Sequence, residues 1–179
     1  QVTNLAYKLF PCCSSTHPSI QAALNLVQNN NIKITNIERI EIYLPTENYN
    51  FVGAPFKIRN NPQVDAQFSN AYTVATAIIK KKVNIKDFLE SNIKKNVEVI
   101  KLAKKIYSYP NKELNWYDLN SVKTKLIIKF KNGDNLMETI KNIKGYPENP
   151  VEIEDVINKF YDCIVFSGKK LGKNKTDDL

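Results

Sequence analysis

The feature that most constrains the fold is a pair of alternating stretches on either side of Asn132-Gly133. Apolar and polar side chains alternate over residues 122–130, and Leu136, Glu138 and Ile140 follow the Asn-Gly pair as the partner strand. Alternation places successive side chains on opposite faces of a strand. The Asn-Gly pair supplies the positive φ that a tight turn requires. The sequence therefore predicts a β-hairpin at about 122–141.

Periodic apolar residues elsewhere predict one further strand and several helices. The strand ends at Pro45, because Ile40, Ile42 and Leu44 alternate with polar residues. Residues 46–66 hold two prolines, one glycine and several asparagines, and they predict a long irregular loop. The order of elements predicts an α+β fold, in which helices cover a small β-sheet and a C-terminal helix follows. The helices are expected at about 18–29, 66–81, 84–91, 96–103 and 151–166.

Length and composition indicate a globular chain of one domain, or of one domain with an appendage. The 179 residues are 42% hydrophobic and 25% charged, with no apolar run long enough to predict a membrane span. The three cysteines are an odd number, which argues against a disulfide framework and favours a reducing, cytoplasmic setting. With a single histidine, a zinc site is not expected. The chain begins at Gln1 without a signal-peptide pattern, so we expect it to start within a longer protein.

The formal net charge of +8 raises the alternative of a nucleic-acid-binding module. The lysines are scattered, however, and Arg39 and Arg59 are the only arginines in the sequence. Specific readout of bases and phosphates relies on arginine. A solvated lysine surface is therefore favoured over a nucleic-acid groove.

Three groups of short motifs follow one another along the chain. They are K-L-F-P-C-C at 8–13 with T-H-P at 16–18, R-N-N-P at 59–62 with A-Q-F-S at 66–69 and Y-T-V-A at 72–75, and G-Y-P-E-N-P at 145–150 with K-F at 159–160. In this order they resemble the MmgE/PrpD family, which includes 2-methylcitrate dehydratase. The resemblance covers about residues 5–165, and it departs from the family at Arg59, which two asparagines separate from Pro62.

The resemblance implies a two-part architecture. Family members have a large helical domain and a smaller α+β lid domain, and they are often homodimers through the helical domain. Residues 4–145 would form the lid-like domain. Residues 146–179 would be the last helix and tail of a helical domain whose remainder is absent from this chain.

The resemblance also implies a chemistry. The family acts without a cofactor on small di- and tricarboxylates: members dehydrate 2-methylcitrate in propionate metabolism, decarboxylate cis-aconitate or epimerise iminodisuccinate. The sequence leaves open which of these reactions applies, and we expect this chain alone to be inactive. A non-catalytic remnant of a split gene is a further alternative.

Four residues are candidates for the site. The lysine that matches Lys8 lies at the domain cleft in the family, where it pairs with a substrate carboxylate; the alternative is that Lys8 is one of many exposed surface lysines. His17 is a candidate for proton transfer, because its ordinary pKa is near neutrality, or it caps its own helix. Arg59 is a candidate carboxylate clamp, or a surface residue. Tyr49 falls where the family can place a cleft tyrosine.

The segment between Lys8 and His17 also contains cysteine and hydroxyl side chains, which we expect to pack or to cap the helix. Cys12 and Cys13 lie near a predicted helix start, where a thiol pKa is lowered, but no histidine–aspartate pair is placed to activate them. We expect them to pack. Residues 14–16 precede the helix and are expected to cap it rather than to bind substrate.

Overall fold

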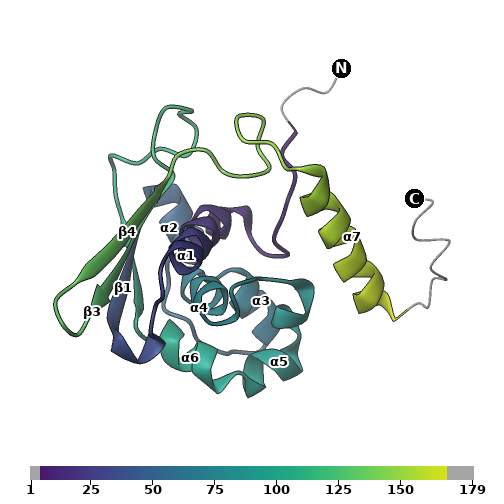
Figure 1. Cartoon of the computed structure of the whole chain (residues 1–179), viewed down its shortest axis with the longest axis horizontal. Coiled ribbons are helices and arrows are strands. Elements are labelled where there is room, and N and C mark those ends of the chain that lie inside the picture. The colour runs from purple at the N-terminus through teal and green to yellow at the C-terminus, as the bar shows by residue number, and fades with distance from the viewer. Residues whose placement is uncertain (1–4, 169–179) are drawn as a thin grey trace.

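The computed structural model describes residues 5–168 and confirms the α+β class (Figure 1). Its helices are α1 (His17–Asn29), α2 (Thr46–Val52), α3 (Pro62–Gln67), α4 (Asn70–Lys80), α5 (Glu90–Lys95), α6 (Val97–Ala103) and α7 (Ile153–Ser167). Its strands are β1 (Ile37–Leu44), β2 (Ile106–Pro110), β3 (Thr124–Phe130) and β4 (Asn135–Ile140). Short 3-10 turns, η1 (Ser14–Thr16), η2 (Ile34–Asn36) and η3 (Ile85–Phe88), lie between them.

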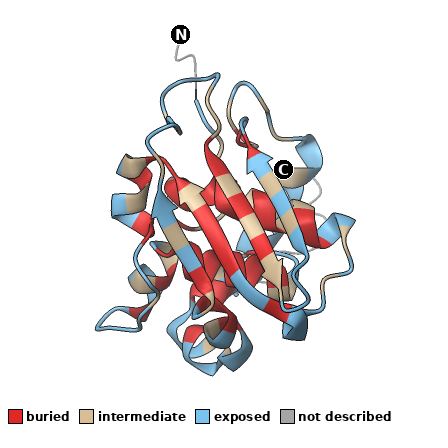
Figure 2. Cartoon of the chain, turned by 90° about the vertical axis from the view of Figure 1, so that its left-hand side faces the viewer, coloured by how far each residue is buried: buried red, intermediate tan, exposed pale blue. Residues whose placement is uncertain are grey.

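The strands form one mixed sheet in the order β2-β1-β3-β4, with β1 parallel to β2 and the other pairs antiparallel. Ile40 of β1 lies opposite Ile106 on one side and Ile128 on the other, so these side chains share one face. Helices α1 and α4 cover that face (Figure 1), while the other face is open to solvent (Figure 2). We call residues 12–143, which hold the sheet and the helices packed on it, the α/β body.

The predicted hairpin is confirmed. Residues 131–134 lie between β3 and β4, and the amide of Phe130 donates to the carbonyl of Asp134 at 2.9 Å, which leaves residues 131–133 as the loop. Gly133 has φ +91°, as a three-residue hairpin loop with glycine in the left-handed region requires.

The core of the α/β body lies between the sheet and the two covering helices. Ile42 of β1, Ile20 of α1 and Val74 of α4 are fully buried. Tyr72 packs in the core as well, and its hydroxyl donates to the carbonyl of Asp87 at 2.7 Å. Burying a phenol hydroxyl without a hydrogen-bond partner would destabilise the fold. This core fixes the start of α1 and the chain segment that precedes it.

The prediction of a long loop at 46–66 is wrong, because α2 and α3 lie within or across it. Both are too short to show helical periodicity. The signal for α3 was nevertheless local: Asn61 caps it by accepting from the amide of Val64 at 3.1 Å, and Pro62 follows at its start. Strand β2 was missed, because its five residues form only an edge strand.

Two predicted helices are divided in the structure. The helix expected at 66–81 breaks between α3 and α4, where the Ser69 side chain accepts from the amide of Tyr72. The helix expected at 84–91 consists of η3, with the predicted cap at Asn84, and of the start of α5, because Leu89 has extended backbone angles. In both places a side chain or backbone turn ends one helix and starts the next.

Helix α7 is confirmed close to the predicted bounds, and it lies at the edge of the α/β body, beside η3 (Figure 1). None of its residues is buried. Its apolar side chains are largely exposed, among them Ile153 at 65% and Val165 at 62%. Across residues 5–168 the structure contains no helix with the length and apolar character needed to cross a membrane.

Candidate functional site

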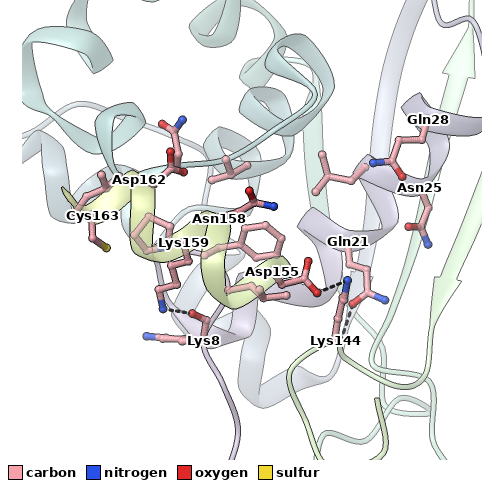
Figure 3. A pocket seen from close by; sticks show the side chains of 17 residues that line it. Lys8, Gln21, Asn25, Gln28, Lys144, Asp155, Asn158, Lys159, Asp162 and Cys163 are labelled. Carbon is pink, nitrogen blue, oxygen red and sulfur yellow. Dashed lines mark hydrogen bonds and ion pairs between the residues drawn. The ribbon is translucent and has the colours of Figure 1, made fainter. Parts of the chain in front are cut away.

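A pocket of about 480 Å³ lies between the α/β body, the N-terminal segment (residues 7–11) and α7 (Figure 3). This volume suits a small-molecule ligand. The N-terminal segment brings Lys8, α1 brings a polar stripe through Gln21, Asn25 and Gln28, and α7 brings Lys159. Residues far apart in the sequence therefore meet at one cavity.

The backbone on both sides of Lys8 is held in place. The amide of Tyr7 donates to the carbonyl of Gly145 at 2.6 Å. Gly145 has φ +100°, and a Cβ there would lie 2.1 Å from the Tyr7 carbonyl oxygen, so only glycine fits. On the other side, the Lys8 carbonyl accepts from Lys159, and the Phe10 carbonyl is 3.1 Å from His17 Nε2.

The ammonium group of Lys8 is exposed at the pocket. Within residues 5–168, no hydrogen bond or ion pair occupies it. A lysine with a fixed backbone and a free ammonium group suits the binding of an anion. Its placement agrees with the carboxylate-binding role predicted for it, which stays a prediction.

His17 is buried beneath the N-terminal segment, with only 3% of its surface exposed. Burial, and then the positive charge of Lys8, lower its pKa to about 4, although hydrogen bonds to the carbonyls of Phe10 and Cys12 act in the opposite direction. The imidazole is therefore neutral at pH 7. Because a carbonyl only accepts, Nε2 carries the hydrogen that it donates to Phe10. In this arrangement His17 positions the backbone that follows Lys8, and proton transfer by it stays a prediction.

Arg59 and Tyr49 do not line this pocket. The Arg59 side chain is 67% exposed, and its Nε lies 3.9 Å from an oxygen of Asp65. Tyr49 lines a separate hollow of about 250 Å³ beside Tyr107 and Tyr109 of β2. The structure thus brings only Lys8 of the four candidates to the cavity wall, with His17 directly behind it.

The residues between Lys8 and His17 serve mainly in packing. The expectation that residues 14–16 cap the helix is wrong, because no side-chain hydrogen bond caps the start of α1. Cys12 is buried, its Sγ lies 3.1 Å from the hydroxyl of Thr16, and burial raises the pKa of its thiol to about 12. Such a thiol is not a nucleophile at neutral pH. Thr16 also donates to the carbonyl of Cys13, and Ser15 accepts from Asn48 at 2.9 Å. Both hydroxyl groups are thereby engaged inside the α/β body.

Sequence reasoning missed the contribution of α7 and of the segment before it. Lys144 forms an ion pair with Asp155 at 2.6 Å, and its amide donates to Gln21 at 2.9 Å. Lys159 was visible only as part of a short motif, with nothing to show that it meets Lys8. Residues 5–168 contain no group of three or more histidine, cysteine, aspartate or glutamate side chains arranged to hold a metal ion.

Comparison with known proteins gives two matches. A family model described as the MmgE/PrpD C-terminal domain matches residues 10–175, a range that begins two positions after Lys8. Cis-aconitate decarboxylase of Aspergillus terreus is 26% identical to the chain over 161 residues. That alignment covers 86% of this chain but 32% of the relative, so the chain spans about a third of the relative's length.

Proposed function

This chain belongs to the MmgE/PrpD family, matching its C-terminal domain, and we propose on that premise that it forms one wall of the active site of a cofactor-independent lyase or epimerase. The substrate class is a small di- or tricarboxylate. The relative named cis-aconitate decarboxylase supports a tricarboxylate in particular. Breaking a C–H or C–C bond beside a carboxylate requires cations that hold the carboxylates in place.

The observation that carries this proposal is the position of Lys8. Its ammonium group lies at a ligand-sized cavity, its backbone is held on both sides, and no residue of 5–168 neutralises it. A carboxylate of the substrate would complete this site through a charge-assisted hydrogen bond.

We also propose that the rest of the active site belongs to a helical domain preceding residue 4. Residues 4–145 would be the lid and residues 146–179 the last part of that helical domain. The exposed apolar residues of α7 support this division, because an amphipathic helix needs a partner for its apolar face. Lys144 and Lys159 would then face the cleft between the two domains.

Two measurements on the chain test this proposal. We expect no decarboxylation of cis-aconitate and no dehydration of 2-methylcitrate, both followed by proton NMR, because the proposal assigns the other half of the active site to the upstream helical domain. We expect cis-aconitate to bind weakly, and Lys8→Met to weaken that binding about tenfold, as the loss of a charged hydrogen bond predicts. Lys112→Met is the matched control, since it removes one exposed lysine away from the pocket.

Turnover by the chain alone would contradict the proposed division into domains. Equal binding by wild type and Lys8→Met would contradict the role of Lys8. The coding sequence upstream of Gln1 gives an independent test, because the proposal requires it to encode a helical domain with its own histidine and aspartate residues.

A further inference from the structure

Lys159 of α7 brings a second ammonium group to the pocket beside Lys8 (Figure 3). The two lysines are 151 positions apart in the sequence, yet Lys159 Nζ donates to the backbone carbonyl of Lys8. The same ammonium lies 4.6 Å from the centre of the Tyr7 ring. A carbonyl and an aromatic ring attract a cation, but neither carries a full negative charge that would neutralise it.

The charges of the pocket do not balance around these two lysines. Lys144 and Asp155 neutralise each other in their ion pair. The lining holds one further carboxylate, Asp162, against the two remaining lysines, so the pocket keeps a net positive charge. No carboxylate of residues 5–168 lies within ion-pair distance of Lys8 or Lys159. The positive charges of both lysines also disfavour the protonated form of His17 and help to lower its pKa. Two like charges held close together repel each other, and an anion between them removes that cost.

We infer that Lys8 and Lys159 form a two-point site that binds two carboxylate groups of one small polycarboxylate. This inference rests on the proposed function and adds a specificity-determining residue to it. Lys8 would take one carboxylate from the N-terminal segment, and Lys159 would take a second from α7. A monocarboxylate would engage only one of the two, so the site would favour di- and tricarboxylates.

The position of Lys159 on α7 has a consequence for selectivity. Asn158 also lines the pocket from the same helix, and its amide is suited to a hydroxyl group or a third carboxylate. The cavity of about 480 Å³ has room for a small tricarboxylate. The N-terminal segment and α7 would thus divide the carboxylates of one ligand between them.

The test is a titration of the chain with tricarballylate and, separately, with acetate, followed by amide NMR at low ionic strength. The variants separate charge from position. Lys159→Gln keeps a donor for the Lys8 carbonyl but loses the charge, whereas Lys159→Met loses both. We expect each variant to weaken tricarballylate binding about tenfold, and Lys112→Met to stay within about twofold of wild type. We expect acetate binding, which needs only Lys8, to change less than about twofold in Lys159→Gln.

The outcomes separate this inference from the proposed function. If Lys159→Met weakens tricarballylate binding and Lys159→Gln does not, Lys159 only positions Lys8, and the two-point site is overturned. Unchanged binding in both Lys159 variants, with loss in Lys8→Met, would also overturn it and leave the proposed function intact. If wild type binds neither tricarballylate nor cis-aconitate, the proposed substrate class fails, and the two-point site fails with it. Thermal unfolding of each variant confirms that the fold is retained.

Discussion

The α/β body and α7 differ in what holds them in place. In the α/β body, alternate residues of β1 such as Ile40 and Ile42 are fully buried against α1 and α4. Helix α7 has 15 residues and buries none of them. It lies beside η3, and two polar contacts tie it to the rest of the molecule: the Lys144–Asp155 ion pair and the hydrogen bond from Lys159 to the Lys8 carbonyl. The α/β body is therefore stabilised from within, whereas α7 presents an apolar face that needs a partner.

Helix α7 nevertheless has complete local signals for its own formation. Glu152 and Asp155 form a capping box at its start, and Gly168 ends it with φ +68°. A helix can thus be well specified by its sequence while its place in the fold is not. The pocket lies where these two kinds of structure meet, and for that reason it depends on both.

The largest effect is expected in the core of the α/β body. Ile42→Ala removes a fully buried side chain and leaves a cavity, so the free energy of unfolding should fall by about 2–5 kcal/mol. Urea unfolding followed by circular dichroism measures it. Ile42→Val is the graded control, with an expected loss of about 1 kcal/mol. A loss below about 1 kcal/mol in Ile42→Ala would mean that this core is less tightly packed than the burial indicates.

The next effect is a pH dependence that arises from His17. Burial lowers its folded-state pKa to about 4 from an ordinary value of 6.5, so the unfolded chain binds the proton first on acidification. Stability from this group is therefore present above pH 6.5 and is lost as the pH falls toward 4. The loss amounts to about 3 kcal/mol.

The single histidine makes this measurement unambiguous, since only one imidazole titrates in the proton NMR spectrum. Urea unfolding at several pH values supplies the matching stability curve. In His17→Gln, which can still donate to the Phe10 carbonyl, the slope between pH 6.5 and pH 5 should disappear, whereas carboxylates with a lowered pKa, Glu41 and Asp155, still contribute at more acidic pH. An imidazole that titrates near its ordinary pKa would show that the N-terminal segment does not cover His17 in solution.

The contrast between the two regions also explains what the sequence could predict. The hairpin around Gly133 and the helix of α7 were found because alternation, turns and caps are local signals. Strand β2 was missed because an edge strand of five residues gains its definition from pairing with β1. Lys8 was found through a local motif, but its meeting with Lys159 depends on contacts across 151 positions. No pattern within either segment predicts the contact between these two lysines.

A smaller effect is expected at the joint between the α/β body and α7. Gly145→Ala places a Cβ against the Tyr7 carbonyl oxygen at φ +100°, and the free energy of unfolding should fall by about 2 kcal/mol. Gly133→Ala is the matched control, because Gly133 also has positive φ but has no atom within 4 Å of the added Cβ. Its cost should be about 1 kcal/mol. Equal losses in the two variants would mean that the Tyr7–Gly145 contact is not formed in solution.

The smallest effect should come from the exposed apolar face of α7. Ile153→Ala and Val165→Ala remove side chains that are 65% and 62% exposed, so each should change the free energy of unfolding by less than about 0.5 kcal/mol. Urea unfolding under the conditions used for Ile42→Ala makes the values comparable. A loss above about 1.5 kcal/mol would show that α7 packs through this face in solution, either on the α/β body or on a second copy of the chain. Repeating the measurement at two protein concentrations separates these cases, because only self-association makes the unfolding midpoint depend on concentration. A smaller change would mean that this face is uncovered in the chain, as the proposed upstream helical domain requires.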